Sequence, residues 1–464
     1  MASDDVRASR APVWSPWGDR LLAVLAVGLA LCFVWWWIGT AYLDLPLTTY
    51  LSWKPDDLPV AVPPHIPEAI LGSHYFGDFQ ESRWWGVDIL DGSSPYRFAN
   101  IYPPGAAWFM VPFALLPEIP SFLAYIALTT AALLLPMWFL LRGVRPSLRL
   151  ITIGLAGAAT APFIATVDRG NLQGLTIGLV GFALVALQRS QTRWACVLLA
   201  LAICLKPFFI VLALAAILRG RRTFATNTIA LALAATVIAW LAIPGDRMTN
   251  LANIIRSQVD ATGGPDFVFA ERVWANSSLH GLLANVARIA EDVFGATFDA
   301  SSTVLGAAVV AGWLALVGVV VGRRRLPQWV WGTLTLSCLQ LAQPYAATYT
   351  ATWASLAAVW FAVGTLIPPR LAAEDDERVD HWVTALRAFA IAALATTLLP
   401  LALRPGTAEV VVPIQQMAGP ILWIALGVTA LLASLARPTR PASSPPALSV
   451  TGVTGATASG AERA

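Results

Sequence analysis

Long apolar runs, separated by shorter polar segments, recur along the whole chain of 464 residues. Many are about 17 to 25 residues long, which lets a helix rising 1.5 Å per residue cross a hydrocarbon core of about 30 Å. The composition agrees, because 57% of the residues are hydrophobic and only 12% are charged, whereas a soluble domain carries about twice that charge. The pattern predicts an all-α fold, that of a polytopic helical membrane protein.

The arginine clusters predict how the chain is oriented in the membrane. They lie at 7–20, 142–149, 189–193, 219–222, 323–325 and 437–440. Because positively charged loops stay in the cytoplasm, all of these clusters should share one side. About twelve transmembrane helices satisfy this condition, with both termini cytoplasmic. The predicted spans are 21–43, 121–141, 150–166, 171–187, 194–206, 207–218, 224–243, 302–321, 328–343, 346–366, 384–403 and 412–436.

Two stretches required a choice. The apolar stretch 194–218 is long enough for one span, but one span would place the arginines at 189–193 and 219–222 on opposite sides. We therefore divide it at Lys206 and Pro207, which puts the lysine at an outer turn. The stretch 105–116 is too short to cross and is bounded by prolines. We predict an interfacial or re-entrant helix there, on the outer face.

This topology divides the chain into three parts. Residues 1–20 form a cytoplasmic segment, and 21–436 form the transmembrane domain, with large outer loops at 44–122 and 244–301. Residues 437–464 are rich in Pro, Ser, Thr, Gly and Ala, a composition typical of a disordered tail.

The unusual polar residues then fall on the outer side. They are Asp78 in the first loop, the segment from Asp168 to Gln173 between two spans, Lys206 at its turn, and the segment from Asn276 to His280 after the second large loop. A carboxylate and two cations at the mouth of a membrane cavity suit a reaction in which a lipid phosphate leaves while an alcohol attacks. The cations stabilise the leaving phosphate, and the carboxylate accepts the hydroxyl proton.

Simpler interpretations remain open for several of these residues. Arg169 and Lys206 are long enough to reach lipid head groups from a span end. The segment Asn276-Ser277-Ser278 is also an ordinary helix N-cap sequence, and His280 also suits a structural position. No metal site is expected, because the few histidines lack ligand spacing, and all four cysteines lie in apolar runs.

The order of several short motifs carries a family resemblance. They are Asp78-Phe79, Gly92-x-x-Pro95-Tyr96, Tyr102-Pro103-Pro104, Pro112-x-x-x-Leu116-Pro117, Arg169-Gly170-Asn171, Leu205-Lys206-Pro207, Leu218-Arg219-Gly220-Arg221-Arg222 and Asn276-Ser277-Ser278-Leu279. In this order the chain resembles the family 87 glycosyltransferases of the GT-C superfamily, polyprenol-phosphate-mannose-dependent α-mannosyltransferases. The resemblance runs from about residue 20 to about residue 345.

The resemblance implies a GT-C-like fold in the plasma membrane with its active site on the outer face. It implies an inverting, metal-independent transfer of mannose from a polyprenyl-phosphate sugar to a hydroxyl of a lipid-linked or cell-surface glycan. We expect no cofactor and no nucleic-acid partner, only the donor, the acceptor and membrane lipids. Only Asp78 matches the family's catalytic base. We assign Arg169, Lys206 and Tyr102 to the donor phosphate, and Asn171, Gln173, Asn276 and His280 to the sugar or acceptor.

The chain departs from the family pattern in two places. The family's Arg-Gly-Gln-x-Asn is replaced by Arg169-Gly170-Asn171-Leu172-Gln173, with the two amides exchanged. Its Ser-Pro-x-Ser-Trp-x-His segment corresponds to 342–349, which contains no histidine. The donor sugar therefore stays open, with arabinofuranose as one alternative. A lipid or glycan transporter is a second, although the paired halves typical of transporters are missing. A partner subunit that has lost activity is a third.

Overall fold

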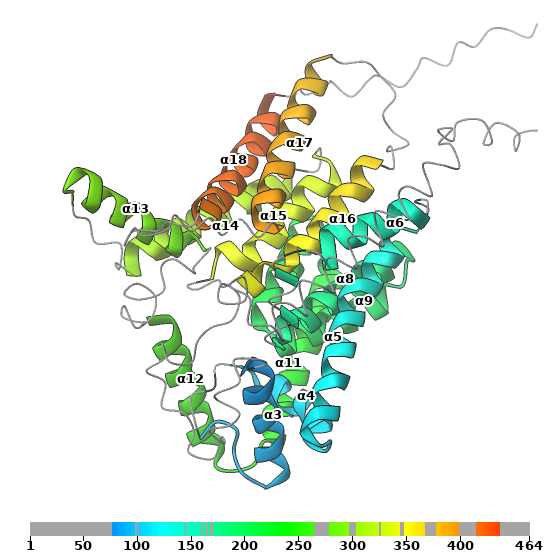
Figure 1. Ribbon diagram of the computed structural model, residues 1–464, viewed down its shortest axis with the longest axis vertical. Coiled ribbons are helices and arrows are strands. Elements are labelled where there is room, and N and C mark those ends of the chain that lie inside the picture. The colour runs from blue at the N-terminus through cyan, green and yellow to red at the C-terminus, as the bar shows by residue number, and fades with distance from the viewer. Residues whose placement is uncertain are drawn as a thin grey trace, which may run out of the picture.

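The computed structural model describes residues 77–97, 100, 102–142, 144, 146–158, 160, 162–163, 166–167, 170–263, 278–296, 303–323, 326–343, 348–366, 377–398 and 414–436. Within these ranges the regular structure is helical and contains no strand. Figure 1 shows a helical bundle, with α3 and α12 at one end and α17 and α18 at the other. The predicted all-α fold is confirmed.

Most helices coincide with predicted spans. They are α5 (Glu118–Leu140), α6 (Pro146–Ile153) with its π-helical continuation (Gly154–Ala158), α8 (Leu172–Gln188), α9 (Thr192–Leu205), α10 (Ile210–Leu218), α11 (Arg222–Ala242), α14 (Thr303–Gly322), α15 (Gln328–Leu341), α16 (Trp353–Leu366), α17 (Glu377–Leu398) and α18 (Ile414–Ala436). In the described part, four helices are long and apolar enough to cross a membrane, at Pro120–Leu140, Arg222–Ala242, Val304–Gly322 and Met417–Leu435, and six apolar helices are shorter. A polytopic membrane protein is thus confirmed. The number of twelve stays a prediction, since span 21–43, the segment 1–20 and the tail 437–464 lie outside the described residues.

Three predicted spans differ from the structure. In the span 346–366, a 3-10 helix (Thr348–Thr352) precedes α16, which begins at Trp353. A continuous helix over 150–166 is wrong, because the helix is interrupted at Thr160, where the backbone bends. The Thr160 hydroxyl donates to the Gly157 carbonyl (2.7 Å) and accepts from the Phe163 amide (3.4 Å), so one side chain replaces helical hydrogen bonds on both sides of the break. Helix α17 begins at Glu377 rather than at 384. Its first turns are polar and precede the apolar run from which the span was predicted.

The division of the stretch 194–218 is confirmed. Helix α9 ends at Leu205, and Lys206 is extended (φ −145°, ψ 109°) before a 3-10 turn at Pro207–Phe209. Near the starts of α9 and α11, Cys196 Sγ lies 3.7 Å from the Phe224 carbonyl oxygen.

Near the other ends of these two helices lies α4 (Pro104–Ala114). Its Gly105 abuts Cys204 of α9, and its Trp108 Nε1 donates to the Ala239 carbonyl of α11 (3.0 Å). Helices α9 and α11 are therefore parallel, and α10 returns between their ends. The turns that carry Arg189 and Arg193 and then Arg219, Arg221 and Arg222 lie together. Residues of both turns line one pocket of about 380 Å³.

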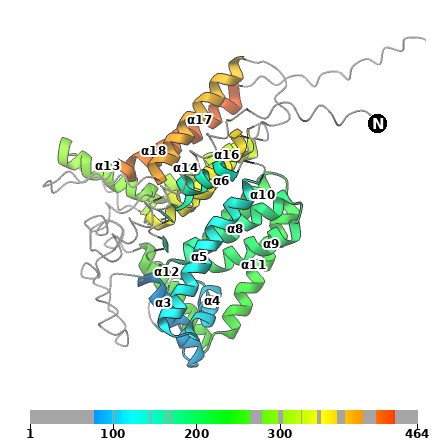
Figure 2. The same ribbon diagram turned by 45° about the vertical axis from the view of Figure 1, so that its right-hand side comes forward.

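The short helices gather at the Lys206 end of the bundle. Helix α3 (Gly77–Leu90) packs on α4, which covers most of the predicted interfacial stretch 105–116. Helix α12 (Arg247–Gly263) is tied to the loop after α3, since Asn253 Nδ2 donates to the Tyr96 carbonyl (2.9 Å). Figure 2 shows α3, α4 and α12 together at this end, opposite to α17, while α13 (Leu279–Phe294) extends away from the bundle. This end contains the candidate site.

Candidate functional site

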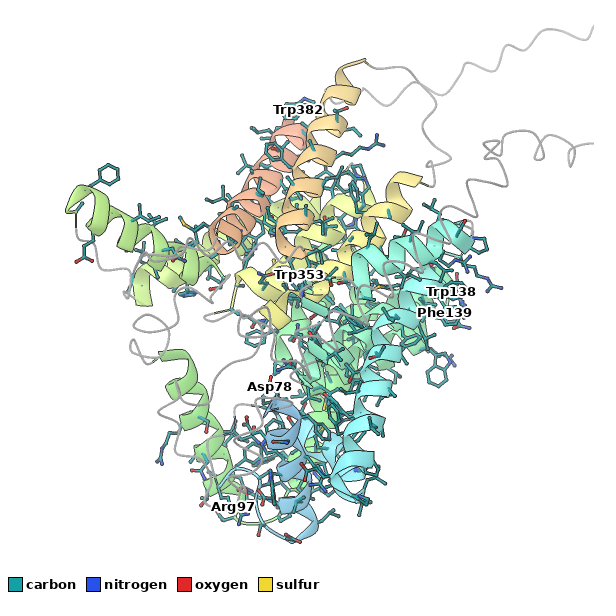
Figure 3. All side chains as sticks on the ribbon, viewed as in Figure 1. Asp78, Arg97, Trp138, Phe139, Trp353 and Trp382 are labelled. Carbon is teal, nitrogen blue, oxygen red and sulfur yellow. The ribbon has the colours of Figure 1, made fainter. Side chains whose placement is uncertain are left out.

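Asp78 lies in the first turn of α3. A carboxylate is favourable there because the N-terminal end of a helix carries partial positive charge. The next residue, Phe79, is only 1% exposed and anchors this turn against α5, with its ring centroid 4.9 Å from that of Tyr125. Figure 3 shows Asp78 at the end of α3 nearest the bundle and Arg97 at the opposite end. Asp78 is therefore held on a rigid aromatic anchor and directed toward the spans.

Asn171 reaches Asp78 from the start of α8. The preceding Gly170 has a left-handed backbone (φ 63°), which glycine adopts without strain. Asn171 then caps α8, because its Oδ1 accepts from the Gln173 amide (2.8 Å). This bond fixes the direction of the side-chain amide, so Nδ2 faces the carboxylate and donates to Asp78 Oδ2 at 2.5 Å. Asn171 is completely buried.

Lys206 completes the connection from the turn between α9 and α10. Its Nζ donates to Asn171 Oδ1 (3.1 Å) and lies 5.2 Å from the centre of the Tyr102 ring, within the range of a cation–π interaction. Burial lowers the pKa of this ammonium to about 8, and the negative charge of Asp78 partly opposes the shift. Asp78, Asn171, Lys206 and Tyr102, here called the Asp78 cluster, thus form one connected group.

Three residues without an assigned role hold Tyr102 in place. Asn100 Oδ1 accepts from the Tyr102 amide (2.9 Å), and the Tyr96 hydroxyl donates to the Tyr102 carbonyl (3.1 Å). The Trp85 ring lies 4.9 Å from the Tyr102 ring, centre to centre. Tyr96 belongs to the Gly-x-x-Pro-Tyr motif, but only the fold shows that it supports Tyr102.

The remaining candidates are placed differently. Gln173 is buried in the first turn of α8, where its backbone amide serves the Asn171 cap. His280 is the second residue of α13 and packs so closely on α14 that a Cβ added at Gly306 would lie 2.6 Å from His280 Nε2. Burial lowers the pKa of His280, and a hydrogen bond to the Gln343 backbone raises it. Within the described ranges, no hydrogen bond joins His280 to the Asp78 cluster.

Arg169 and Asn276 lie outside the described residues, as do Asp168 and residues 344–347 of the segment 342–349. The neighbouring Ser278 is the N-cap of α13, since its hydroxyl accepts from the Gly281 amide (3.2 Å). The helix-cap interpretation of Asn276-Ser277-Ser278 is therefore confirmed for Ser278. Across the described part of the chain, no group of three His, Cys, Asp or Glu side chains is placed to hold a metal ion.

The Asp78 cluster combines two opposite chemical functions. The Asp78 carboxylate can accept a proton, and the Lys206 ammonium can stabilise an anion. The Asn171 amide joins them through one bond to each. Such a pair suits a transfer in which a hydroxyl loses its proton while negative charge develops on a departing group.

The close contact between Gly170 and Phe79 can be tested by substitution. A Cβ there would lie 2.5 Å from the Phe79 Cβ, whereas a Cβ at Gly92, which also has a positive φ, meets nothing within 4 Å. Gly170→Ala should therefore destabilise the protein by about 2 kcal/mol or more, from backbone strain and the contact together. Gly92→Ala should show the strain alone. Thermal unfolding in detergent measures both, and equal losses would contradict a tight fit between Gly170 and Phe79.

Comparison with known proteins agrees with this chemistry. The family model of glycosyltransferase family 87 matches residues 100–339, a range that contains Tyr102, Asn171 and Lys206 and begins after Asp78. No curated protein matches the sequence. Because the family match spans more than half of the chain, the protein belongs to glycosyltransferase family 87 and is a membrane glycosyltransferase.

Proposed function

We propose that this glycosyltransferase moves mannose from a polyprenyl-phosphate donor to a hydroxyl of a lipid-linked or cell-surface glycan. The reaction takes place at the outer face of the plasma membrane and inverts the anomeric centre. The observation that carries the proposal is the chain of contacts from Asp78 through Asn171 to Lys206. It puts a proton acceptor and a phosphate-binding cation within one connected group.

The proposed transfer is a single displacement. The acceptor hydroxyl gives its proton to the Asp78 carboxylate, and its oxygen forms the new bond to the anomeric carbon. The bond from that carbon to the phosphate oxygen breaks, and the lipid phosphate leaves with the electron pair. Because attack and departure occur on opposite faces of the sugar, the configuration inverts, and one carboxylate acting as a base is sufficient.

The two cations act on the phosphate that leaves. Lys206, together with Arg169, which directly precedes Gly170 in the sequence, stabilises the charge that develops on the departing phosphate. Tyr102 faces the Lys206 ammonium and borders the donor phosphate. We assign the sugar or the acceptor to Gln173, Asn276 and His280. Asn171 lies between the base, Asp78, and the cation, Lys206.

The proposed orientation follows from the two ends of the bundle. Arginine-bearing turns lie together at one end, which is typical of the cytoplasmic side. The Asp78 cluster lies at the Lys206 end, where the short helices α3, α4 and α12 gather. A polyprenyl phosphate inserted in the outer leaflet brings its phosphate to the level of the Asp78 cluster. In this orientation both termini lie in the cytoplasm.

The test uses the purified protein in detergent with labelled donors. Polyprenyl-phosphate mannose, polyprenyl-phosphate arabinofuranose and a nucleoside-diphosphate mannose are each supplied with an envelope glycolipid extract as acceptor. We expect label to enter the glycolipid from polyprenyl-phosphate mannose alone. If label entered from the arabinofuranose donor alone, the proposed donor sugar would change from mannose to arabinofuranose, and the proposed displacement mechanism would stand. Label from the nucleotide sugar would refute dependence on a lipid donor.

A further inference from the structure

Two buried hydroxyl groups on α5 have no hydrogen-bond partner in the described part of the chain. They belong to Tyr125 and Thr129, which are 0% and 1% exposed. The residues are one helical turn apart and therefore lie on the same face of α5. Their hydroxyls are close enough to interact, but neither makes a bond of normal geometry. An unsatisfied buried hydroxyl is costly and indicates a partner in the working molecule.

Packing explains the ring of Tyr125 but not its hydroxyl. The ring contacts Phe79 and also Phe113, at 4.9 and 5.3 Å between centroids. Phenylalanine would make the same aromatic contacts without burying an oxygen. The oxygen therefore needs a reason other than the stability of this aromatic cluster.

The position of the pair relates it to the Asp78 cluster. Tyr125 packs on the residue that follows Asp78, and its hydroxyl lies within electrostatic reach of the Asp78 carboxylate. Thr129 lies against the first turn of α8, since a Cβ at Gly174 would be 2.6 Å from the Thr129 methyl carbon. The two hydroxyls thus lie where α5 packs against α3, which carries Asp78, and against the start of α8, which Asn171 caps.

We propose that Tyr125 is a positioning residue for Asp78, whose carboxylate receives a hydrogen bond from the Tyr125 hydroxyl, directly or through one ordered water that Thr129 also binds. This inference rests on the proposed role of Asp78 as the base. A carboxylate has room for several donors on its two oxygens, so the bond from Asn171 to Oδ2 does not exclude another. Tyr125 keeps its proton throughout the transfer, and only the acceptor hydroxyl loses one.

The test is the pH dependence of kcat/KM for Tyr125→Phe. Loss of a donor to the ionised carboxylate raises the pKa of Asp78, because the charged form loses its stabilisation. The acid limb of the profile should therefore move to higher pH by about one unit, the effect of a single hydrogen bond to a charged group. Transfer should approach the wild-type rate at high pH, where Asp78 is ionised in both proteins. Thr129→Val should move the limb in the same direction.

The matched control is Thr228→Val. The Thr228 hydroxyl is also fully buried and without a partner in the described structure, but it lies in the part of α11 near the arginine-bearing turns. Its loss should leave the acid limb in place. Each variant keeps the shape of the side chain it replaces, so all three should fold and insert into the membrane, and Thr228→Val should also keep the wild-type melting temperature.

The outcomes separate this inference from the proposed function. Wild-type activity in Asp78→Asn would refute the base assignment and this inference with it. An inactive Asp78→Asn together with an unmoved acid limb in Tyr125→Phe would refute the positioning role alone. An equal shift in Thr228→Val would also refute it, since any buried hydroxyl would then have the same effect.

Discussion

Replacing Asp78 by asparagine will lower the rate of sugar transfer by about 10²–10⁴-fold, the usual contribution of a positioned general base. The variant should fold normally. Asparagine has the same shape as aspartate, and its side-chain oxygen can still accept the hydrogen bond from Asn171 Nδ2. What it cannot do is take a proton from the acceptor hydroxyl.

The measurement is kcat with saturating donor, together with the melting temperature in the same detergent. Asp91→Asn is the matched control, because Asp91 is exposed and lies directly after α3, at the end of the helix remote from Asp78. The control should retain the wild-type rate. Near-normal turnover in Asp78→Asn would remove Asp78 as the base, and an equal loss in both variants would show that the charge of this region, rather than one carboxylate, matters.

Hydrophobic run length predicted much of the bundle. Helix α11 and helix α14 lie within two residues of their predicted spans, because a run that must cross lipid leaves little freedom in where its helix lies. The turn at Lys206 needed a second kind of information. Its apolar surroundings indicate one long helix, and only the placement of arginines on both sides predicted the return of α10.

The incorrect span predictions have local physical causes. Hydropathy does not register the break at Thr160, since threonine tolerates apolar surroundings when its hydroxyl bonds to the backbone. It also missed the polar first turns of α17. A hydropathy profile reports where a chain tolerates lipid, whereas a helix ends where its backbone groups find other partners.

The candidate site was only partly predictable. Asp78, Asn171 and Lys206 were each identified from unusual polarity or from a motif, yet nothing in the sequence states that Asn171 bonds to both of the others. That relation depends on how α3, α8 and α9 meet. Tyr125 gave no signal at all, because a tyrosine in an apolar span has the pattern of ordinary packing.

The second large effect concerns Lys206. Lys206→Met keeps an unbranched apolar stem and removes the charge, and we expect transfer to fall by about 10²–10³-fold, the usual loss when one group that stabilises developing negative charge is removed. The fold should persist, because Asn171 Oδ1 keeps its bond from the Gln173 amide. Arg193→Met is the control, since Arg193 is exposed at the arginine-bearing end of the bundle, and it should leave the rate unchanged.

The pH profile distinguishes phosphate binding from the simpler role of Lys206 as a head-group contact. Burial lowers the pKa of this lysine to about 8, so the free protein carries the positive charge below that pH and loses it as the pH rises through it. If the charge holds the donor phosphate, kcat/KM should fall on the alkaline side with a midpoint near 8. In Lys206→Arg this limb should move beyond the measurable range, because a guanidinium stays charged. A lysine that only reaches lipid head groups predicts no such limb, and it predicts that Lys206→Met transfers sugar at the wild-type rate.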